Sequence, residues 1–264
     1  MTDPCARMAH VLRPREGRAA EAVGPGARHR VRTLLSLLPG DTTRVLEVGC
    51  GDGMVLAPLR EKGIQVVGLD ISPGALRWVP PPRLSGSAGA LPFPDRAFDL
   101  VLLADVLEHL PDGVYGSALA EAARVAARYL LLNAPDREDL AAEATCCPSC
   151  RREFHPSWHL RSLSVEALAQ ALPGFHPVRV LATGGPGSRS LAGLRRLQRR
   201  LDVWPSVREA VCPACGTVFS QGAGRPSPGG RLCQAAVWAW DSLRSRAGVQ
   251  DAEFAVLLER RDPS

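Results

Sequence analysis

The feature that most constrains the fold of this 264-residue chain is the segment RVLEVGCGDG at residues 44–53, where an apolar run leads into alternating glycines. Val45, Leu46 and Val48 are typical of a buried parallel strand. Glycines permit backbone dihedrals and close ligand contacts that other residues forbid, and a helix is expected to begin at about Met54. The segment therefore predicts a strand–turn–helix unit whose bare backbone a nucleotide-like ligand can approach.

A second apolar run, residues 65–72, follows about twenty positions after the glycine turn. Asp70 stands at the end of this predicted strand, where a carboxylate can accept hydrogen bonds from both hydroxyls of a ribose. Ser72 and Pro73 come next, and a serine before a proline is typical of a helix start. The two segments together predict buried strands that end at a ribose-bearing ligand.

The spacing Glu-x-Gly-x-Gly-x-Gly, from Glu47 to Gly53, differs from the Gly-x-Gly-x-x-Gly of dinucleotide-binding proteins. It resembles the first motif of the class I S-adenosylmethionine-dependent methyltransferases. The segment ending in Asp70 supports the resemblance, and residues 90–110 look like that family's fourth strand with its flanking loops. The resemblance is close from about Val45 to Asn133. It implies a Rossmann-like, doubly wound α/β fold with a seven-stranded sheet, and S-adenosylmethionine as cofactor.

The same resemblance implies a set of cofactor-binding residues along the turn and the strand ends: Glu47, Gly49, Gly51, Gly53, Asp70, Ile71, Ser87, Ala88, Leu91 and Ala104. Many relatives carry an acid just before the segment 88–92, where it binds the adenine amino group. This chain has Ser87 at that position. We therefore expect adenine to be held by the Ser87 hydroxyl, by backbone groups and by apolar contacts from Ile71 and Leu91.

Further strands are expected at residues 83–87, 98–104, 128–133, 175–182 and 253–259, with helices between most of them. This alternation predicts a parallel sheet with helices on both faces, and the resemblance implies that the last strand lies antiparallel beside the fifth. Residues 1–39 are expected to form a helical cap with an apolar stripe that could cover the cofactor cleft. Residues 40–264 would form the methyltransferase domain without a second large domain, and residues 221–230 a loop.

Length and composition fit an enzyme-sized α/β protein, since 45% of the residues are hydrophobic and the formal charge is +5. Lys62 is the only lysine, so arginines carry the positive charge; a charge of this size is usually a matter of solubility. No apolar run reaches about eighteen residues, and the N-terminus lacks a basic-then-apolar signal pattern. A cytoplasmic protein is expected, in which structural disulfides are rare.

Two copies of Cys-Pro-x-Cys-x-x-x-Phe, at residues 147–154 and 212–219, form the second distinctive pattern. Each copy is typical of a zinc knuckle, a tight turn whose backbone amides point at two thiolates. Together the two copies supply four ligands: Cys147, Cys150, Cys212 and Cys215. Such a site is closed, so the zinc is expected to be structural. It would cross-link two insertions, at about 144–160 and 208–222.

Other interpretations use the same cysteines. Four reduced thiols could pack as small hydrophobic side chains, and a methyltransferase acting on a soft metalloid would use cysteines to bind arsenite. A redox pair is disfavoured because no thioredoxin-like unit accompanies the motif. Cys146 is expected to be a bystander or an alternative ligand. His155 and His159 could complete a Cys2His2 site, although the spacing from Cys150 to His155 is far shorter than in a zinc finger.

Methyl transfer from a sulfonium is an in-line displacement, so placing the acceptor about 3 Å from the methyl carbon supplies much of the catalysis. A hydroxyl acceptor also needs a general base, whereas an amine or carboxylate does not always need one. His159 is the first candidate, because a similar histidine-containing segment borders the substrate pocket in relatives. His109, which matches a histidine common in the family just past the fourth strand, and Asp105 are the other candidates.

One predicted helix, residues 191–201, carries Arg195, Arg196, Arg199 and Arg200 beside an apolar face. A solvated face is the default interpretation; a phosphate-bearing small substrate and an RNA backbone are the functional alternatives. The sequence favours a methyltransferase that acts on a small or carrier-linked molecule, such as a sugar or a natural product. RNA modification and a methyltransferase-like binding module without turnover are the alternatives, and the intact cofactor motif argues against the module.

Overall fold

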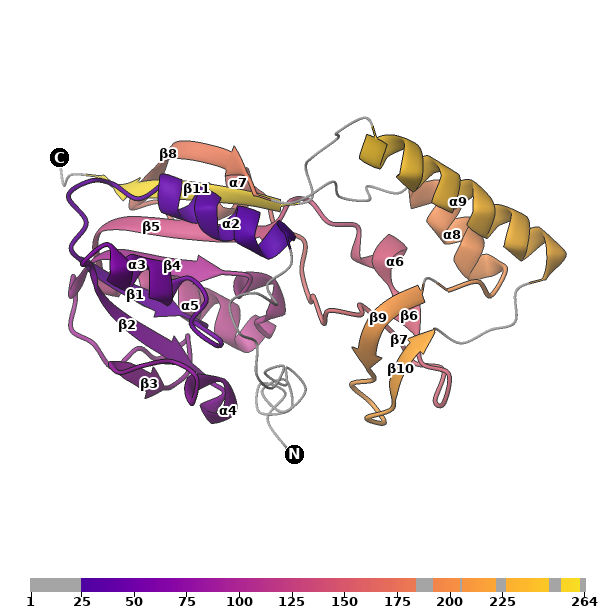
Figure 1. Ribbon diagram of the computed structural model, residues 1–264, viewed down its shortest axis with the longest axis horizontal. Helices are drawn as coiled ribbons and strands as arrows, with labels where there is room; N and C mark the ends of the chain where they lie inside the picture. Colours follow the sequence, from indigo (N-terminus) through magenta and orange to yellow (C-terminus); the bar gives the residue numbers. More distant parts are fainter. Residues whose placement is uncertain (1–24, 184–191, 205, 222–226, 247–252, 262–264) are drawn as a thin grey trace. The chain divides into compact units, whose positions relative to one another are not determined.

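A computed structural model describes residues 25–183, 192–204, 206–221, 227–246 and 253–261 (Figure 1). The chain divides into two compact units, each built from separate stretches of sequence. Unit 1 comprises residues 1–136, 163–185 and 253–264, and unit 2 comprises residues 137–162 and 186–252. No described helix has both the length and the apolarity to cross a membrane.

Unit 1 contains a seven-stranded sheet in the order β3-β2-β1-β4-β5-β11-β8. Its strands are β1 (Arg44–Val48), β2 (Gln65–Asp70), β3 (Arg83–Ser85), β4 (Phe98–Ala104), β5 (Ala126–Pro135), β8 (Phe175–Ala182) and β11 (Glu253–Arg260). The first five strands are parallel, and β11 lies antiparallel between β5 and β8. The expected strands and the antiparallel last strand are therefore confirmed. The strand order reverses between β1 and β4, where open α/β sheets bind their ligands.

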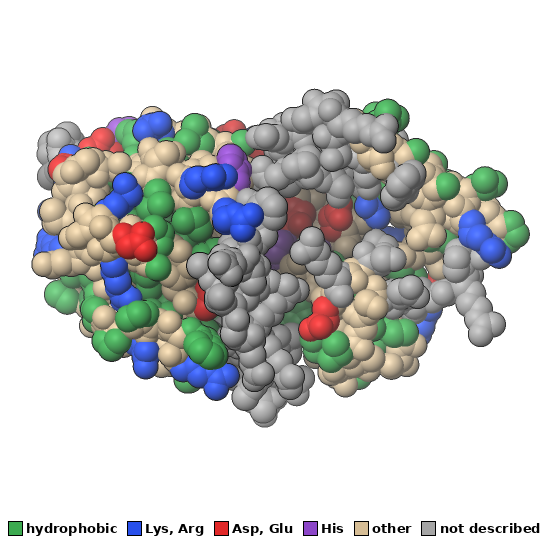
Figure 2. All heavy atoms as spheres, viewed as in Figure 1, with side chains coloured by type: hydrophobic (Ala, Val, Ile, Leu, Met, Phe, Trp, Pro, Cys, Tyr) green, Lys and Arg blue, Asp and Glu red, His purple; other side chains and the backbone are tan. Residues whose placement is uncertain are grey.

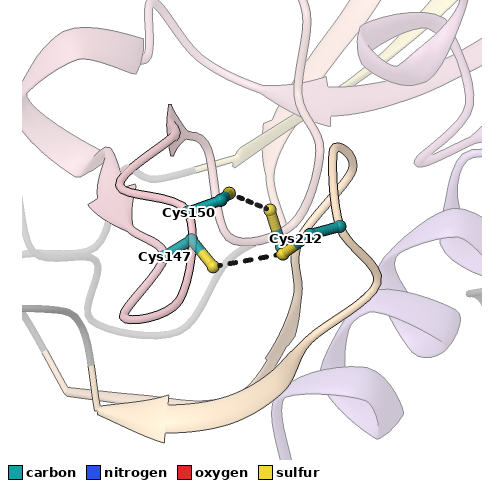
Figure 3. Close-up of side chains that lie close together, drawn as sticks. Cys147, Cys150 and Cys212 are labelled. Atoms are coloured by element: carbon teal, nitrogen blue, oxygen red, sulfur yellow. Dashed lines mark hydrogen bonds between the residues drawn. The ribbon is translucent and has the colours of Figure 1, made fainter.

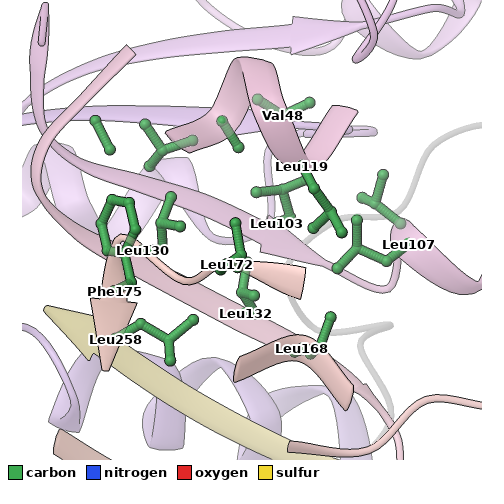
Figure 4. Packing of buried hydrophobic residues seen from close by; sticks show 14 of the residues in the cluster. Val48, Leu103, Leu107, Leu119, Leu130, Leu132, Leu168, Leu172, Phe175 and Leu258 are labelled. Carbon is green, nitrogen blue, oxygen red and sulfur yellow. The ribbon is translucent and has the colours of Figure 1, made fainter. Parts of the chain in front are cut away.

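Both faces of this sheet are covered, because alternate side chains of each buried strand point to opposite sides. On one face α5 (Asp112–Val125) and α7 (Val165–Ala171) pack on the sheet through residues such as Leu119 and Leu168 (Figure 4). On the other face lie α2 (Pro25–Ser36), α3 (Leu56–Glu61) and α4 (Pro73–Leu76). A 3-10 turn, η2 (Leu107–His109), follows β4. This packing on both faces holds the carboxyl end of β1 in place, where the chain leads into the glycine turn.

Helix α2 belongs to the hydrophobic core of unit 1. Leu34 and Leu37 are each 1% exposed and join the cluster that contains Val45 and Leu131. The apolar stripe expected to cover the cofactor cleft is thus used, at least in large part, to pack α2 on the sheet. Residues 1–24 lie outside the described residues, so the helical cap stays a prediction for that part of the chain.

Unit 2 is more extensive than the two short knuckles expected from the sequence. Its elements are α6 (Leu140–Glu143), β6 (Thr145–Cys146), β7 (Glu153–Phe154), α8 (Ala192–Arg200), β9 (Ser206–Val211), β10 (Val218–Gln221) and α9 (Pro228–Arg246). Strands β6 and β7 form one antiparallel hairpin, and β9 and β10 form another. Helix α8 packs against α6 and α9. The prediction of a loop at residues 221–230 was wrong at its C-terminal end, because helix α9 already begins at Pro228.

Candidate cofactor and metal sites

The glycine turn after β1 requires glycine at its first position. Gly49 has a φ of 73°, and a Cβ atom there would lie 2.4 Å from Cγ2 of Val106. The backbone N–H groups of Gly49 and Cys50 both donate to the carbonyl oxygen of Leu69, at 2.7 and 3.1 Å. The turn is thereby held against the end of β2. Helix α3 begins at Leu56, slightly later than the expected Met54, after a turn.

Asp70 ties the glycine turn to the next helix. Its Oδ2 accepts a hydrogen bond from the backbone N–H of Gly51 at 2.8 Å, and its Oδ1 accepts one from that of Ser72 at 2.7 Å. The Ser72 hydroxyl in turn accepts from the N–H of Ala75 at 3.3 Å, so the predicted cap of α4 is confirmed. Each carboxylate oxygen has two lone pairs, which leaves acceptor capacity for ribose hydroxyls. The geometry is therefore compatible with the role expected of Asp70.

Glu47 is a buried carboxyl group directly beneath the turn. It is 3% exposed, and its Oε2 has no hydrogen-bond partner among the described residues. Burial, followed by the negative charges of Asp70 and Asp52, raises the pKa of Glu47 well above its ordinary value. A buried charge without a partner is costly, so burial favours the neutral form of Glu47. A cationic group, such as the amino group of S-adenosylmethionine, would favour the ionised form.

Glu47 makes the stability of the cofactor-free protein depend on pH. Because its folded-state pKa is raised, its contribution is fully present below the unfolded value near 4.5 and is lost as pH rises through the folded value. The Glu47→Gln variant cannot ionise at this position. As the pH rises from the unfolded to the folded pKa of Glu47, we expect this variant to lose less free energy of unfolding than the parent protein. Urea unfolding at a series of pH values measures this difference. Parallel stability curves for the two proteins would contradict the assignment.

The residues expected around adenine differ in how much surface they offer. Ile71 is 40% exposed, whereas Leu91 is 4% exposed and packs in the core. The Ser87 hydroxyl accepts from the N–H of Gly89 at 3.2 Å and so shapes its own loop. Ala88 is half-buried, and Ala104 is the last residue of β4, at the carboxyl end of that strand. Of these residues Ile71 offers the most open apolar surface, and the adenine contacts stay predictions.

Asp105, one of the candidate bases, follows β4 in a left-handed conformation with a φ of 54°. Its carboxylate forms an ion pair with Arg30 of α2, and Arg30 also pairs with Glu253 at 3.0 Å. Burial would lower the pKa of Arg30, but the two carboxylates outweigh burial and raise it. An ion-paired carboxylate is a weak proton acceptor, so the pairing disfavours Asp105 as the base. No sequence motif pointed to Arg30.

His109 ends η2 and is half-buried, just past β4 as expected. Its backbone N–H donates to the carbonyl oxygen of Val106 at 3.1 Å, which closes the turn. This contact supports a structural contribution to the loop. The catalytic alternative stays a prediction.

In unit 2 the four knuckle cysteines converge on one point (Figure 3). The Sγ atoms of Cys147 and Cys215 are 3.6 Å apart, those of Cys150 and Cys212 are 3.5 Å apart, and all four lie within 4.8 Å of one another. A tetrahedron with Zn–S bonds of about 2.3 Å has S···S edges of about 3.8 Å. The thiols are therefore spaced as four ligands of one tetrahedral ion would be.

The two knuckles repeat the same backbone pattern. The N–H of Arg151 donates to the carbonyl oxygen of Cys147 at 3.0 Å, and that of Gly216 donates to Cys212 at 2.9 Å. Arg151 and Gly216 both adopt a left-handed conformation, with φ values of 61° and 73°. The phenylalanines of the two motifs pack edge to face with ring centroids 6.0 Å apart. The sequence repeat thus corresponds to a repeat in structure.

The surroundings of the cluster favour thiolates at two of its positions. Burial would raise the pKa of Cys147, but hydrogen bonds from backbone amides, including that of Ser149, lower it. Hydrogen bonds from Thr217 lower the pKa of Cys215 to about 6. Cys146 is different, because it is 1% exposed, packs with Trp204, and burial raises its pKa. Cys146 lies outside the four-sulfur group, as expected of a bystander.

His155 and His159 lie together in unit 2 with stacked rings, and both contact one carboxylate, that of Glu138. His155 Nε2 is 3.2 Å from Glu138 Oε1, and His159 Nδ1 is 2.5 Å from Glu138 Oε2. The four-sulfur group includes neither histidine. The structure therefore gives no support to the Cys2His2 alternative. Nothing in the sequence singled out Glu138.

Comparison with known proteins agrees with the site in unit 1. A family profile described as "Methyltransferase domain" matches residues 46–129. A ubiquinone biosynthesis O-methyltransferase of Azorhizobium caulinodans is 32% identical over 122 residues, which are 42% of this chain and 47% of that protein. The chain thus spans about half the length of this curated relative. A demethylmenaquinone methyltransferase of Renibacterium salmoninarum is 30% identical over 183 residues, 66% of this chain and 69% of that protein.

Solved structures share the fold. A Burkholderia thailandensis 1,6-didemethyltoxoflavin-N1-methyltransferase superposes with a TM-score of 0.54 at 16% identity, covering 99% of this chain and 92% of that one. An Archaeoglobus fulgidus methyltransferase gives a TM-score of 0.53 at 16% identity, covering 88% and 91%. With the sheet order, the glycine turn and the matched sequence, these likenesses show that the chain belongs to the class I S-adenosylmethionine-dependent methyltransferases.

Proposed function

We propose that the protein transfers the methyl group of S-adenosylmethionine to a hydroxyl group of a small aromatic molecule. The observation that carries cofactor use is the Gly49–Gly53 turn, held by Asp70 at the carboxyl ends of β1 and β2. The hydroxyl acceptor is supported by the name of one relative that matches part of the chain, a ubiquinone biosynthesis O-methyltransferase. The name of a second relative, a demethylmenaquinone methyltransferase, supports a small quinone-like acceptor and does not state the acceptor atom. A carrier-linked sugar or natural product is the broader form of the same proposal.

Binding and orientation would supply much of this catalysis. The methyl carbon reacts in line, so the protein has to hold the acceptor oxygen at about 3–3.5 Å and exclude water. A phenolic hydroxyl attacks faster once a base takes its proton, and such bases contribute roughly 10²–10⁴-fold. His159 is our proposed base. Asp105 is the weaker candidate because Arg30 is its ion-pair partner.

We also propose that unit 2 is built around one structural zinc ion held by Cys147, Cys150, Cys212 and Cys215. The support is the spacing of the four sulfur atoms and the hydrogen bonds that favour thiolates at Cys147 and Cys215. Four protein ligands leave no position for water or substrate, which distinguishes a structural from a catalytic zinc. The two symmetric knuckles, which supply four thiols at the spacing of a tetrahedral ion, favour zinc over arsenite.

RNA is the second candidate acceptor, and α8 argues against it. Arg199 pairs with Glu153 and donates to the carbonyl oxygen of Ala141, and Arg196 lies 3.5 Å from Asp139. These arginines thus hold unit 2 together and have less capacity to bind phosphates. Lys and Arg side chains on the face seen in Figure 2 are dispersed among apolar and neutral ones, without one continuous basic patch. A basic stripe is the usual footprint of nucleic-acid binding.

A labelled-donor assay tests the acceptor. Zinc-replete protein would be incubated with methyl-labelled S-adenosylmethionine and, in parallel, with catechols, reduced naphthoquinones, sugar nucleotides and ribosomal RNA. We expect label in an aromatic hydroxyl compound. Label in RNA alone would replace the proposal with RNA modification. Tight cofactor binding without transfer to any acceptor would favour a binding module.

A further inference from the structure

Helix α9 of unit 2 carries an exposed row of apolar side chains. Leu232, Trp240 and Leu243 are 74%, 38% and 62% exposed. Ala236 and Ala239, which lie between the two leucines, are exposed as well. Single exposed apolar residues are ordinary, but a contiguous row of them on one face marks a surface that another molecule covers. We call these five residues the apolar stripe.

The spacing of the stripe is that of a coiled-coil seam. Positions 232, 236, 239 and 243 are separated by four, three and four residues, which is the pattern of the a and d positions of a heptad. Residues three and four apart are neighbours on a helix surface. The leucines and alanines of the stripe therefore form one narrow seam along about three turns of α9, and Trp240 flanks this seam.

Another side of α9 is already used for packing within unit 2. Cys233 and Val237 are 7% and 5% exposed, and α9 packs against α8 (Figure 1). The thiol of Cys233 donates to the carbonyl oxygen of Leu194 in α8, with the sulfur 3.7 Å from that oxygen. The contact with α8 thus buries residues of α9 that lie outside the stripe, and it leaves the stripe itself exposed.

The stripe has the same residue types when α9 is followed in either direction. Leu232 and Leu243 lie at equal distances from its midpoint, and so do Ala236 and Ala239. Two copies related by a twofold axis bury the same patch on each other, so that residue i contacts residue j and j contacts i. Two antiparallel α9 helices would therefore place each leucine against a leucine and each alanine against an alanine. The stripe is complementary to itself.

The sizes of the side chains also fit this pairing. Two helices come closer together where the side chains at their contact are small, and Ala236 and Ala239 occupy the centre of the seam. Leu232 and Leu243 stand at its two ends, where each would gain a large apolar neighbour. The same twofold axis places both copies of Trp240 on one side of the helix pair, where each can cover alanines of the other copy.

A lipid surface is the other class of occupant for an apolar helix face. Helices that lie on membranes bury a broad apolar face between the headgroups and the acyl chains. In α9 the centre of the stripe consists of Ala236 and Ala239, which offer little apolar area to a lipid. A narrow, symmetric seam with small residues in the middle favours a second helix of the same sequence.

We propose that α9 is a dimerisation helix, through which two copies of this chain associate with their α9 helices antiparallel. One helix from each copy makes a contact that is small beside the roughly 1,600 Å² of a standard interface, so the dimer should depend on protein concentration. Helix α8, on which α9 packs, is joined to the first cysteine insertion by the ion pair of Arg199 with Glu153. Removal of the proposed zinc should therefore weaken the dimer as well.

Sedimentation velocity of the full-length, zinc-loaded protein tests the association. Over roughly 1 to 200 µM we expect a shift from monomer to dimer. The double variant Leu232→Gln and Leu243→Gln keeps good helix formers but removes four leucine side chains from each dimer, so it should weaken association by at least roughly 100-fold. The matched control Arg231→Gln changes an exposed residue of the same helix outside the stripe, and it should associate as the parent does.

Cross-linking under mild oxidation tests the antiparallel arrangement. A mixture of the variants Leu232→Cys and Leu243→Cys should form a disulfide-linked dimer, because the two positions face each other in the proposed pair. Either variant alone should cross-link much more slowly, since two copies of one position would lie roughly 16 Å apart along the helix axis. The parent protein, treated in the same way, controls for the native cysteines.

A protein that stays monomeric over this concentration range would overturn the proposal, and so would a dimer that the double glutamine variant leaves unchanged. Self-cross-linking of Leu232→Cys as fast as the mixture would mean a parallel pair and would also contradict it. Cosedimentation with vesicles of phosphatidylglycerol identifies the lipid alternative. If the monomeric parent binds these vesicles and the double glutamine variant does not, the stripe is a membrane contact and the dimer is wrong.

Discussion

Replacing Cys215 by serine is expected to release the zinc and unfold unit 2. Metal–thiolate bonds contribute folding free energy directly, on the order of 10 kcal/mol in small zinc modules. Among the described residues, unit 2 has few buried apolar side chains compared with unit 1, so the polar contacts that join its two stretches, such as that of Arg199 with Glu153, have only a small core behind them. Metal analysis should fall from about one zinc per chain to none, and limited proteolysis should cut within residues 137–162 and 186–252.

Cys146→Ala is the matched control for this experiment. Cys146 is adjacent to a proposed ligand and buried, yet it lies outside the four-sulfur group, so its variant should keep its zinc. The ligand set would be wrong if the double variant Cys212→Ser and Cys215→Ser retained full zinc occupancy. In that case the ligands would have to come from the first knuckle together with His155 and His159.

Replacing Asp70 by asparagine is expected to weaken binding of S-adenosylmethionine by about 1.5 to 3 kcal/mol, roughly 10- to 150-fold. The ribose would lose charge-assisted hydrogen bonds. In addition, the NH2 group of the new asparagine would point at the backbone N–H of Gly51 or Ser72, and two donors cannot form a hydrogen bond. Calorimetry with S-adenosylmethionine and its demethylated product measures the effect. No detectable binding by the zinc-loaded parent protein would contradict cofactor use itself.

Asp99→Asn serves as the control for Asp70. Asp99 also accepts hydrogen bonds from backbone N–H groups, those of Thr43 and Arg44. It stands at the start of β4, the end of the sheet opposite to the glycine turn. We expect this variant to be less stable but to bind the cofactor as the parent does. Equal losses of affinity in both variants would mean that Asp70 acts through stability alone.

The cofactor half of the fold could be predicted because its signals are local. A strand that ends in alternating glycines specifies its turn within ten residues, and the left-handed Gly49 then follows from sterics. Apolar runs bounded by turn residues located all seven strands of the main sheet. The repeated Cys-Pro-x-Cys motif likewise carries its geometry in four residues, so the convergence of the sulfur atoms was foreseeable.

Pairings between distant positions depended on tertiary structure. Arg30 meets Asp105 across 75 residues, and Glu138 meets His159 across 21, without any local pattern that distinguishes these charges from solvated ones. The extent of unit 2 was missed for the same reason, since its two insertions form a compact unit only by packing on each other.

The sequence by itself therefore determined the positions of the strands of the main sheet, its glycine turn and the four-cysteine set, because short-range sterics and motif geometry act within a few residues. Only the tertiary structure decided that Glu138 lies against His155 and His159 and that Arg30 pairs with Asp105. These contacts join segments that are far apart in the sequence, and no local sequence pattern marks them. The backbone has to bring the segments together before the side chains can form hydrogen bonds with each other.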